Sequence, residues 1–248
     1  MPISLILSTA AGFSTLIGAL FAVVKKDPPR ELLSPSLGFS AGVMMAMSLV
    51  DLMPHAVSVL AIEMPGTIGI AACMCAFAAG MLAARLLDLM VAESGKSSSR
   101  LMRVGVFSML ALMLHNIPEG IAVFLSAEQD IVMGVHLCAA IALHNIPEGI
   151  AVAMPVCAAT GSRFFALMMA AVSGMAEPLG AFIAQHYIGA KAGERELALM
   201  FSGIAGLMMA TALYELLPEA FCGKCEKSAS SGALLGVFIM VLGCCIAA

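Results

Sequence analysis

Long apolar runs separated by short polar connections fill almost the whole sequence. Each run is long enough for a helix to cross the roughly 30 Å hydrocarbon core of a bilayer, which takes about 20 residues. The pattern predicts eight spans, at about 3–24, 34–61, 66–90, 102–125, 131–157, 163–188, 196–221 and 230–247. An outer-membrane barrel would show short strands of alternating polarity instead. We therefore expect one all-α integral membrane domain over residues 1–248.

The composition excludes a soluble globular domain. Hydrophobic residues make up 61% of the chain and charged residues 11%, against roughly 25% charged residues in soluble domains. A net charge of −4 and the lack of a basic or aromatic motif argue against nucleic acid as a partner. Six of the eight cysteines lie in apolar runs, where a thiol behaves as a small hydrophobic group. Cys222 and Cys225 form half of a zinc or redox motif, and their role stays open.

Positive charges mark alternate connections between the expected spans. The odd-numbered connections carry Lys25, Lys26, Arg30, Lys96, Arg100, Arg103, Arg163, Lys224 and Lys227, with Arg85 near the end of the third span. The even-numbered connections carry Lys191 and Arg195. Because positively charged loops stay in the cytosol, this split places the odd-numbered connections there and both termini outside. No Lys or Arg precedes Lys25, so the first run lacks the basic start of a signal peptide and should stay as a membrane helix.

A ten-residue segment occurs twice, 29 residues apart. Leu114–Val123 and Leu143–Val152 both have the sequence LHNIPEGIAV. The midpoint between His115 and His144 falls in the polar segment 126–130, which predicts an antiparallel hairpin of the fourth and fifth spans. About 14 residues of helix separate each histidine from this turn, or about 20 Å. Both copies should therefore meet at a similar depth inside the membrane.

The chemistry of the repeated segment points to a metal ion. His115 and Glu119, like His144 and Glu148, are four residues apart and share one helix face. Neutral imidazole and carboxylate together bind zinc, and also ferrous iron, manganese or cobalt. A carboxylate at mid-membrane costs at least about 2.5 kcal/mol unless it is paired or bound to a cation. Two imidazoles and two carboxylates at one depth therefore favour a cation site.

A purely structural role is the alternative. Asn and His side chains can join helices by hydrogen bonds, and Pro118 and Pro147 can kink them. The prolines also loosen the preceding turn and free carbonyl groups, while Gly120 and Gly149 allow close helix approach. Two matching copies at one depth favour the metal site over this alternative.

Other polar residues interrupt the apolar runs and are candidates for the ion pathway. Glu177 precedes a proline in the sixth span and is a candidate ligand, with a buried Glu–His pair as the alternative. Two further pairs lie four residues apart: Asp51 and His55 toward the outer half of the second span, and Glu215 and Glu219 near the cytosolic end of the seventh. The first pair suits an entrance; the second suits either an exit or an ordinary interfacial position. Met44 or its neighbour Met45 could supply a soft thioether.

At these residues the chain resembles the ZIP (zinc–iron permease) family, in its short bacterial-type branch. The resemblance covers essentially the whole chain, and the paired HNIPEG motifs are its most specific part. It implies eight helices in a 3+2+3 arrangement, with inverted three-helix repeats around the central pair and outward termini. The connection after the third span is short and has no histidine, which puts metal sensing through that loop in doubt.

The resemblance also implies a two-metal centre between the fourth, fifth and sixth spans. The first metal would take His115, Glu119, Glu148 and Met44. The second would take Asn116, Asn145, Glu119, Glu148 and Glu177, so that Glu119 and Glu148 bridge the two ions. His144 matches a position that varies within the family and is expected to tune metal choice.

We therefore expect an importer of Zn²⁺, and also of Fe²⁺ or Mn²⁺, that moves the ion toward the cytosol. Zinc would be the transported substrate, with about two ions bound, and no catalytic cofactor is expected. The expected location is the plasma membrane or an organelle membrane, with lipid as the surroundings and a homodimer left open. One alternative is an intramembrane metal-dependent hydrolase using the same ligands to activate water, although no HExxH motif is present. A second alternative is a carrier or channel for something other than a metal, with the carboxylates as proton relays.

Overall fold

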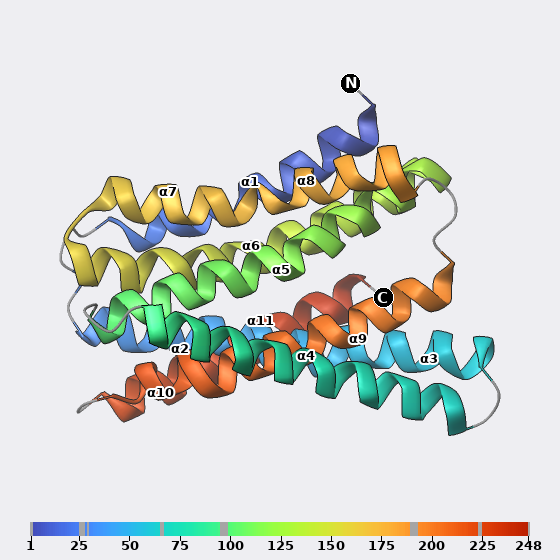
Figure 1. The fold of residues 1–248 in the computed structure, drawn as a ribbon. Helices are drawn as coiled ribbons and strands as arrows, with labels where there is room; N and C mark the ends of the chain where they lie inside the picture. Colours follow the sequence, from blue (N-terminus) through green and yellow to red (C-terminus); the bar gives the residue numbers. More distant parts are fainter. Residues whose placement is uncertain are drawn as a thin grey trace.

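The computed structural model describes residues 2–24, 28, 30–64, 67–94, 99–188, 193–222 and 225–247. Within these ranges all regular elements are helical (Figure 1). They are α1 Ile3–Ala22, α2 Arg30–Ala46, the π-helix η1 Met47–Leu52, α3 Met53–Glu63, α4 Thr67–Ser94, α5 Arg100–Gln129, α6 Ile131–Thr160, α7 Arg163–Gly174, α8 Ala176–Ile183, the π-helix η2 Ala184–Ile188, α9 Glu194–Thr211, the π-helix η4 Ala212–Leu216, α10 Leu217–Ala220 and α11 Glu226–Ala247.

The described residues form eight helices that are long and apolar enough to cross a membrane, which confirms the predicted all-α membrane fold. The second, sixth and seventh spans are each composite. The second consists of α2, η1 and α3, the sixth of α7, α8 and η2, and the seventh of α9, η4 and α10. The predicted boundaries agree to within a few residues.

The central hairpin turns more sharply than the sequence predicted. Helices α5 and α6 are 30 residues long each, and residues 126–129 belong to α5. Only Asp130 separates the two helices, and its carboxylate accepts a hydrogen bond from the backbone N–H of Val132 at 2.8 Å. An aspartate at this position satisfies one of the free N–H groups of the new helix. The predicted polar turn at 126–130 is therefore wrong in extent, although its centre is right.

The prolines of the duplicated motif do not interrupt their helices. Both α5 and α6 continue as α-helix through Pro118 and Pro147. The π-helical turns lie elsewhere, and two of them, η1 and η4, come directly before Pro54 and Pro218. The predicted loosening of backbone next to proline is thus found in the second and seventh spans rather than in the central pair.

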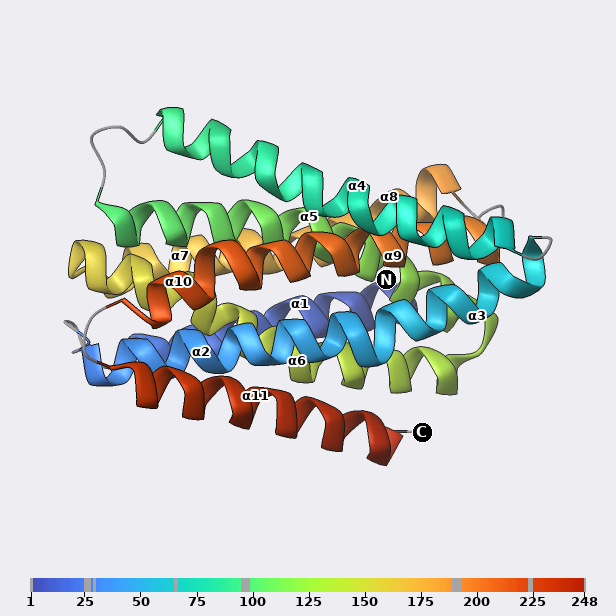
Figure 2. The same cartoon turned by 90° about the horizontal axis from the view of Figure 1, so that it is seen from below.

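The spans pack as two groups, which Figure 1 shows one above the other and Figure 2 shows from below. One group contains α1, α5, α6, α7 and α8, in which α1 packs on α6 and α5 packs on α8. The other contains α2, α3, α4, α9, α10 and α11, in which α2 packs on α11 and α4 packs on α9. Contacts of α2 with α6 and of α9 with α5 join the two groups. The central pair therefore has a span of the second group on each side.

Close backbone contact within the first group depends on glycine, as predicted. A Cβ atom at Gly120 would collide with the backbone carbonyl of Glu177, and one at Gly149 with that of Thr15. These approaches bring α8 and α1 directly against the two copies of the motif. The polar side chains of the two motif copies therefore lie among tightly packed helices.

The chain ends marked in Figure 1 lie toward one end of the bundle, as eight spans require. The helix ends on either side of the even-numbered connections lie at that same end, and those on either side of the odd-numbered ones lie at the other. Of the cations used for the topology, Lys25, Lys26, Lys96, Lys191 and Lys224 lie outside the described residues. Which end faces the cytosol stays a prediction from the charge pattern.

Candidate metal centre

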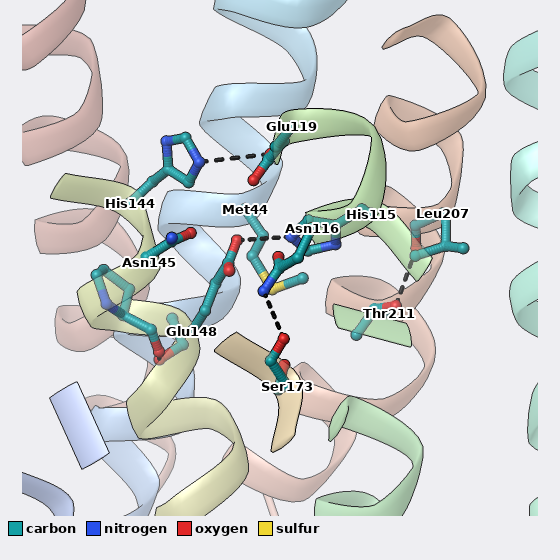
Figure 3. A network of polar contacts seen from close by, with 12 residues as sticks. Met44, His115, Asn116, Glu119, His144, Asn145, Glu148, Ser173, Leu207 and Thr211 are labelled. Carbon is teal, nitrogen blue, oxygen red and sulfur yellow. Dashed lines mark hydrogen bonds and ion pairs between the residues drawn. The ribbon is translucent and has the colours of Figure 1, made fainter. Parts of the chain in front are cut away.

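The duplicated motif lies in the middle of α5 and α6, in the interior of the protein. The seven polar side chains that the motif and the sixth span contribute are no more than 2% exposed: His115, Asn116, Glu119, His144, Asn145, Glu148 and Glu177. The structure thus places all seven in the interior of the bundle, and Figure 3 shows the six of α5 and α6 close together. Apolar residues of the largest core cluster, such as Leu112 and Val152, lie on the same two helices.

The two copies of the motif pair crosswise. His115 of α5 lies 2.9 Å from Glu148 of α6, measured between Nε2 and Oε1. His144 of α6 lies 3.4 Å from Glu119 of α5. Histidine and glutamate of one copy share a helix face, as predicted, but each binds the opposite copy (Figure 3). The two copies therefore do meet, and every acid–imidazole pair bridges the hairpin.

The asparagines connect the hairpin to neighbouring spans. Asn116 donates from Nδ2 to the backbone carbonyl of Ser173 at 3.2 Å. This carbonyl is close to the end of α7, which is interrupted at Met175. Asn145 donates to the backbone carbonyl of Ala11 at 3.0 Å and to the carboxylate of Glu177. Glu177 is thus bonded to an amide, and the alternative of a Glu177–His pair is not what the structure shows.

Many ligand-type atoms in this region have no hydrogen-bond partner. Among the described residues, fifteen buried side-chain nitrogen and oxygen atoms lack one, and ten of them belong to this cluster. They are Nδ1 of His115, Oδ1 of Asn116, both Oε atoms of Glu119, both ring nitrogens of His144, Oδ1 of Asn145, Oε2 of Glu148, Oγ of Ser173 and Oε2 of Glu177. Leaving a buried polar atom unpaired costs about 1–3 kcal/mol. Most of these atoms are of types that could hold a divalent cation.

The side chains do not already converge on one point. No group of three or more His, Cys, Asp and Glu side chains among the described residues has the geometry of a metal site. The carboxylates instead face the opposite imidazoles, which compensates their charge in the apolar interior when those imidazoles carry a proton. Binding an ion at these residues would therefore require the cross pairs to exchange their proton for the metal.

The two methionines of the second span differ in position. Met44 is 1% exposed and extends from α2 toward the cluster in Figure 3. Met45 is half-buried and packs against the edge of the core. Of the two, Met44 is the one placed to offer a thioether to the centre.

The candidate entrance and exit residues differ in burial. Asp51 and His55 are exposed on η1 and α3, and the ring of His55 contacts the ring of Phe201 edge-on at 5.9 Å. Glu215 is 5% exposed and Glu219 is completely buried. None of the four lies within the central cluster.

Sequence reasoning missed the partners of the seventh-span glutamates. Nε of Arg100 lies 2.8 Å from the carboxylate of Glu219, which joins the start of α5 to α10. Asp88 of α4 is 8% exposed, lies next to Glu215 and pairs with Arg85 at 2.6 Å. An Arg and an Asp three residues apart inside an apolar run were the available signal for this second polar cluster.

A cavity of about 430 Å³ opens between α4, α5 and α9. Its lining is apolar except for His115, and it includes Leu114, Ile204 and Leu207. The first histidine of the motif therefore lies next to open space at the boundary between the two groups of spans.

Comparison with known proteins adds the family. The model of the ZIP zinc transporter family matches residues 91–248. A protein named zinc transporter ZupT from Streptococcus mutans is 38% identical, over 96% of this chain and 94% of the relative. Proteins of the same name from Escherichia fergusonii and Chlorobium limicola are 38% and 39% identical over at least 96% of each chain.

These relatives are named as transporters, so the alternative of a membrane metal hydrolase is not supported. Eight membrane-length helices and bacterial relatives make this chain a multi-pass protein of the plasma membrane. The predicted resemblance is confirmed, by the family model over residues 91–248 and by relatives along nearly the full length. The chain belongs to the ZIP zinc transporter family.

Proposed function

We propose that this protein carries Zn²⁺ across the membrane toward the cytosol through the cluster on α5, α6 and α8. The observation that supports this most directly is the set of ten buried nitrogen and oxygen atoms around the two motif copies that have no hydrogen-bond partner among the described residues. Imidazole nitrogens, carboxylates and amide oxygens are ligands that divalent transition-metal ions accept. Fe²⁺ and Mn²⁺ accept the same donor set and are proposed as further substrates.

The ligands are assigned as the family resemblance implies. One ion is held by His115, Glu119, Glu148 and Met44, and a second by Asn116, Asn145, Glu177 and the two bridging glutamates. Amide oxygens of Asn116 and Asn145 have no hydrogen-bond partner among the described residues, while their nitrogens already donate to backbone carbonyls. In both side-chain amides the oxygen is therefore available as a ligand for a cation.

Binding would proceed by exchange of protons for metal. In the crosswise pairs each imidazole faces the opposite carboxylate, and His115 and Glu148 are within hydrogen-bond distance. A divalent ion needs the deprotonated forms of both groups, so its arrival releases protons. Because each pair joins α5 to α6, the ion would bridge the same two helices.

The path is proposed to run from the exposed Asp51 and His55 to the buried Glu215 and Glu219. The cation count places the second pair at the cytosolic end and the termini outside. The chain acts as one transmembrane domain, and its apolar outer surface contacts lipid and leaves room for a homodimer.

The decisive experiment is zinc influx into proteoliposomes containing the purified protein. Wild type is compared with Glu119→Ala, Glu148→Ala and the double variant. Glu63→Ala, at the exposed end of α3, serves as the matched control. We expect influx from wild type and the control, and a loss of at least about tenfold in the others, since each removes a charged ligand.

Absence of influx from a folded wild type would overturn transport as the function. Influx that survives in the double variant would keep transport but exclude a path through the duplicated motif. Equilibrium dialysis with Zn²⁺ on the same samples shows whether binding and influx are lost together.

A further inference from the structure

The second and seventh spans share a sequence that the central motif does not contain. Residues 41–56 and 205–220 are identical at nine of sixteen positions, including an Ala-Gly-x-Met-Met-Ala start and a Pro near the end. In both, an acidic residue lies three positions before the proline, Asp51 in one and Glu215 in the other. The two segments lie in spans that run in opposite directions through the membrane.

The two segments also fold alike. Each starts as α-helix, changes to a π-helix, η1 or η4, and returns to α-helix next to its proline. Their burial agrees as well: Met44 is 1% exposed and Met208 is 0%, while Leu49 and Leu213 are both exposed. Asp51 and His55 are exposed where Glu215 and Glu219 are buried, and that is the main difference. The segments are therefore structural counterparts, and Met208 corresponds to Met44.

Each segment faces one copy of the duplicated motif. On one side α2 packs on α6, and Ser40 donates to the backbone carbonyl of Pro147 at 2.6 Å. On the other side α9 packs on α5, and Leu207 lines the same cavity as His115. Figure 3 shows the Leu207–Thr211 turn of α9 on the side of the cluster where His115 lies. Met208 belongs to this turn, and it lies in the same buried cluster of side chains as Met44.

We propose that Met208 is a second thioether of the ion path, on the α5 side of the cluster as Met44 is on the α6 side. Its sulfur would contact the metal as the ion moves from the cluster toward the seventh span. A thioether is a soft ligand that favours Cd²⁺ and Zn²⁺ over Mn²⁺. The thioethers of Met44 and Met208 would then favour soft ions over hard ions in both halves of the path. This inference rests on the proposed transport function.

The sequence supplies matched controls, because each thioether is followed by a second methionine. Met208→Leu removes the sulfur and nearly conserves volume, and such swaps cost less than about 1.5 kcal/mol. Met209→Leu makes the same change at the adjacent position, which is 7% exposed and turned about 100° away on the helix. Met44→Leu and Met45→Leu repeat the comparison on the second span.

The measurement is uptake of Cd²⁺, Zn²⁺ and Mn²⁺ into proteoliposomes by wild type and the four variants. We expect Met208→Leu to lower the ratio of Cd²⁺ to Mn²⁺ uptake by about threefold or more. Met44→Leu should act in the same direction, and Met209→Leu and Met45→Leu should leave the ratio unchanged. An unchanged ratio in Met208→Leu overturns the proposal, whereas wild type without any uptake overturns the transport function itself.

A second measurement covers the case in which Met208→Leu loses uptake of all three ions. The wild-type protein is labelled with ¹³C-methyl methionine, and the Met208 resonance is assigned by its disappearance in Met208→Leu or Met208→Ile. Addition of Cd²⁺, but not of Mg²⁺, should shift this resonance together with that of Met44. A Met208 resonance that stays in place while that of Met44 shifts overturns the proposal.

Discussion

Arg100 and Glu219 form an ion pair of 2.8 Å that joins the two groups of spans, α5 in one and α10 in the other. The glutamate is completely buried, while about half of the arginine side chain is exposed. A buried carboxylate keeps its charge only with such a partner. The ion pair therefore ties the start of α5 to Glu219, one of the two glutamates of the proposed exit.

Arg100→Ala should lower the free energy of unfolding by about 1–3 kcal/mol, because it removes a charged partner from a buried carboxylate. The check is thermal unfolding of the purified protein in detergent. Arg195→Ala is the control, since the Arg195–Glu196 pair at 2.9 Å is exposed on both sides and such pairs contribute little. Equal melting temperatures for the two variants would contradict a role for the buried pair.

Zinc uptake should fall as the pH is lowered from about 7.5 to 5.5, a range that spans the ordinary imidazole pKa of about 6.5. A protonated imidazole has no lone pair for a metal, so protons compete with Zn²⁺ at His115 and His144. Zinc uptake should therefore decrease in acid and recover when the pH returns to neutral. Uptake is measured with equal pH on both sides of the vesicle, and a flat profile would contradict metal binding at these imidazoles.

Gly120→Ala should lower stability by about 1–3 kcal/mol, since the added methyl group must displace packed backbone. The new Cβ would collide with the backbone carbonyl of Glu177 on α8. Gly243→Ala on α11 is the control, because a Cβ there meets no atom within 4 Å. Melting temperatures of the two variants test this, and no difference between them would mean that α8 packs more loosely than described.

Glu177→Gln should separate ligand chemistry from folding. Glutamine keeps an oxygen that can accept the hydrogen bond from Asn145 but loses the charge. We expect the melting temperature to stay close to wild type while zinc uptake falls at least about tenfold, since the variant removes a carboxylate ligand. Glu128→Gln, whose carboxylate accepts a hydrogen bond from Ser4 at 2.6 Å, is the control. Unchanged uptake in Glu177→Gln would exclude Glu177 as a ligand.

Sequence alone predicted the eight spans, because a 20-residue apolar helix is nearly the only way for such a chain to satisfy its backbone in lipid. The sequence also predicted that the two copies of the motif meet, because they lie equally far from the turn between their helices and therefore at the same depth. It singled out Glu177 in the sixth span as a candidate ligand, and this side chain is buried in the structure.

Pairing between spans was not predictable from spacing along one helix. His115 binds Glu148 rather than its own Glu119, because the rotation of α5 against α6 decides which side chains meet. The Arg100–Glu219 pair likewise joins residues 119 positions apart, and nothing in either local sequence indicates the other. The π-helical turns of η1 and η4 were also missed, since loosened backbone was expected only next to Pro118 and Pro147.

The single-residue turn at Asp130 limits the ways in which α5 and α6 can move. Two helices joined through one residue cannot slide along each other by a turn without unwinding an end. The register of the two motif copies is therefore fixed, and so is the spacing of the ligands they carry. Any motion that exposes the ion to one side and then the other must carry this hairpin as a rigid unit past the second and seventh spans. The movement of the transporter would therefore take place at that boundary, while the ligands on α5 and α6 keep their spacing.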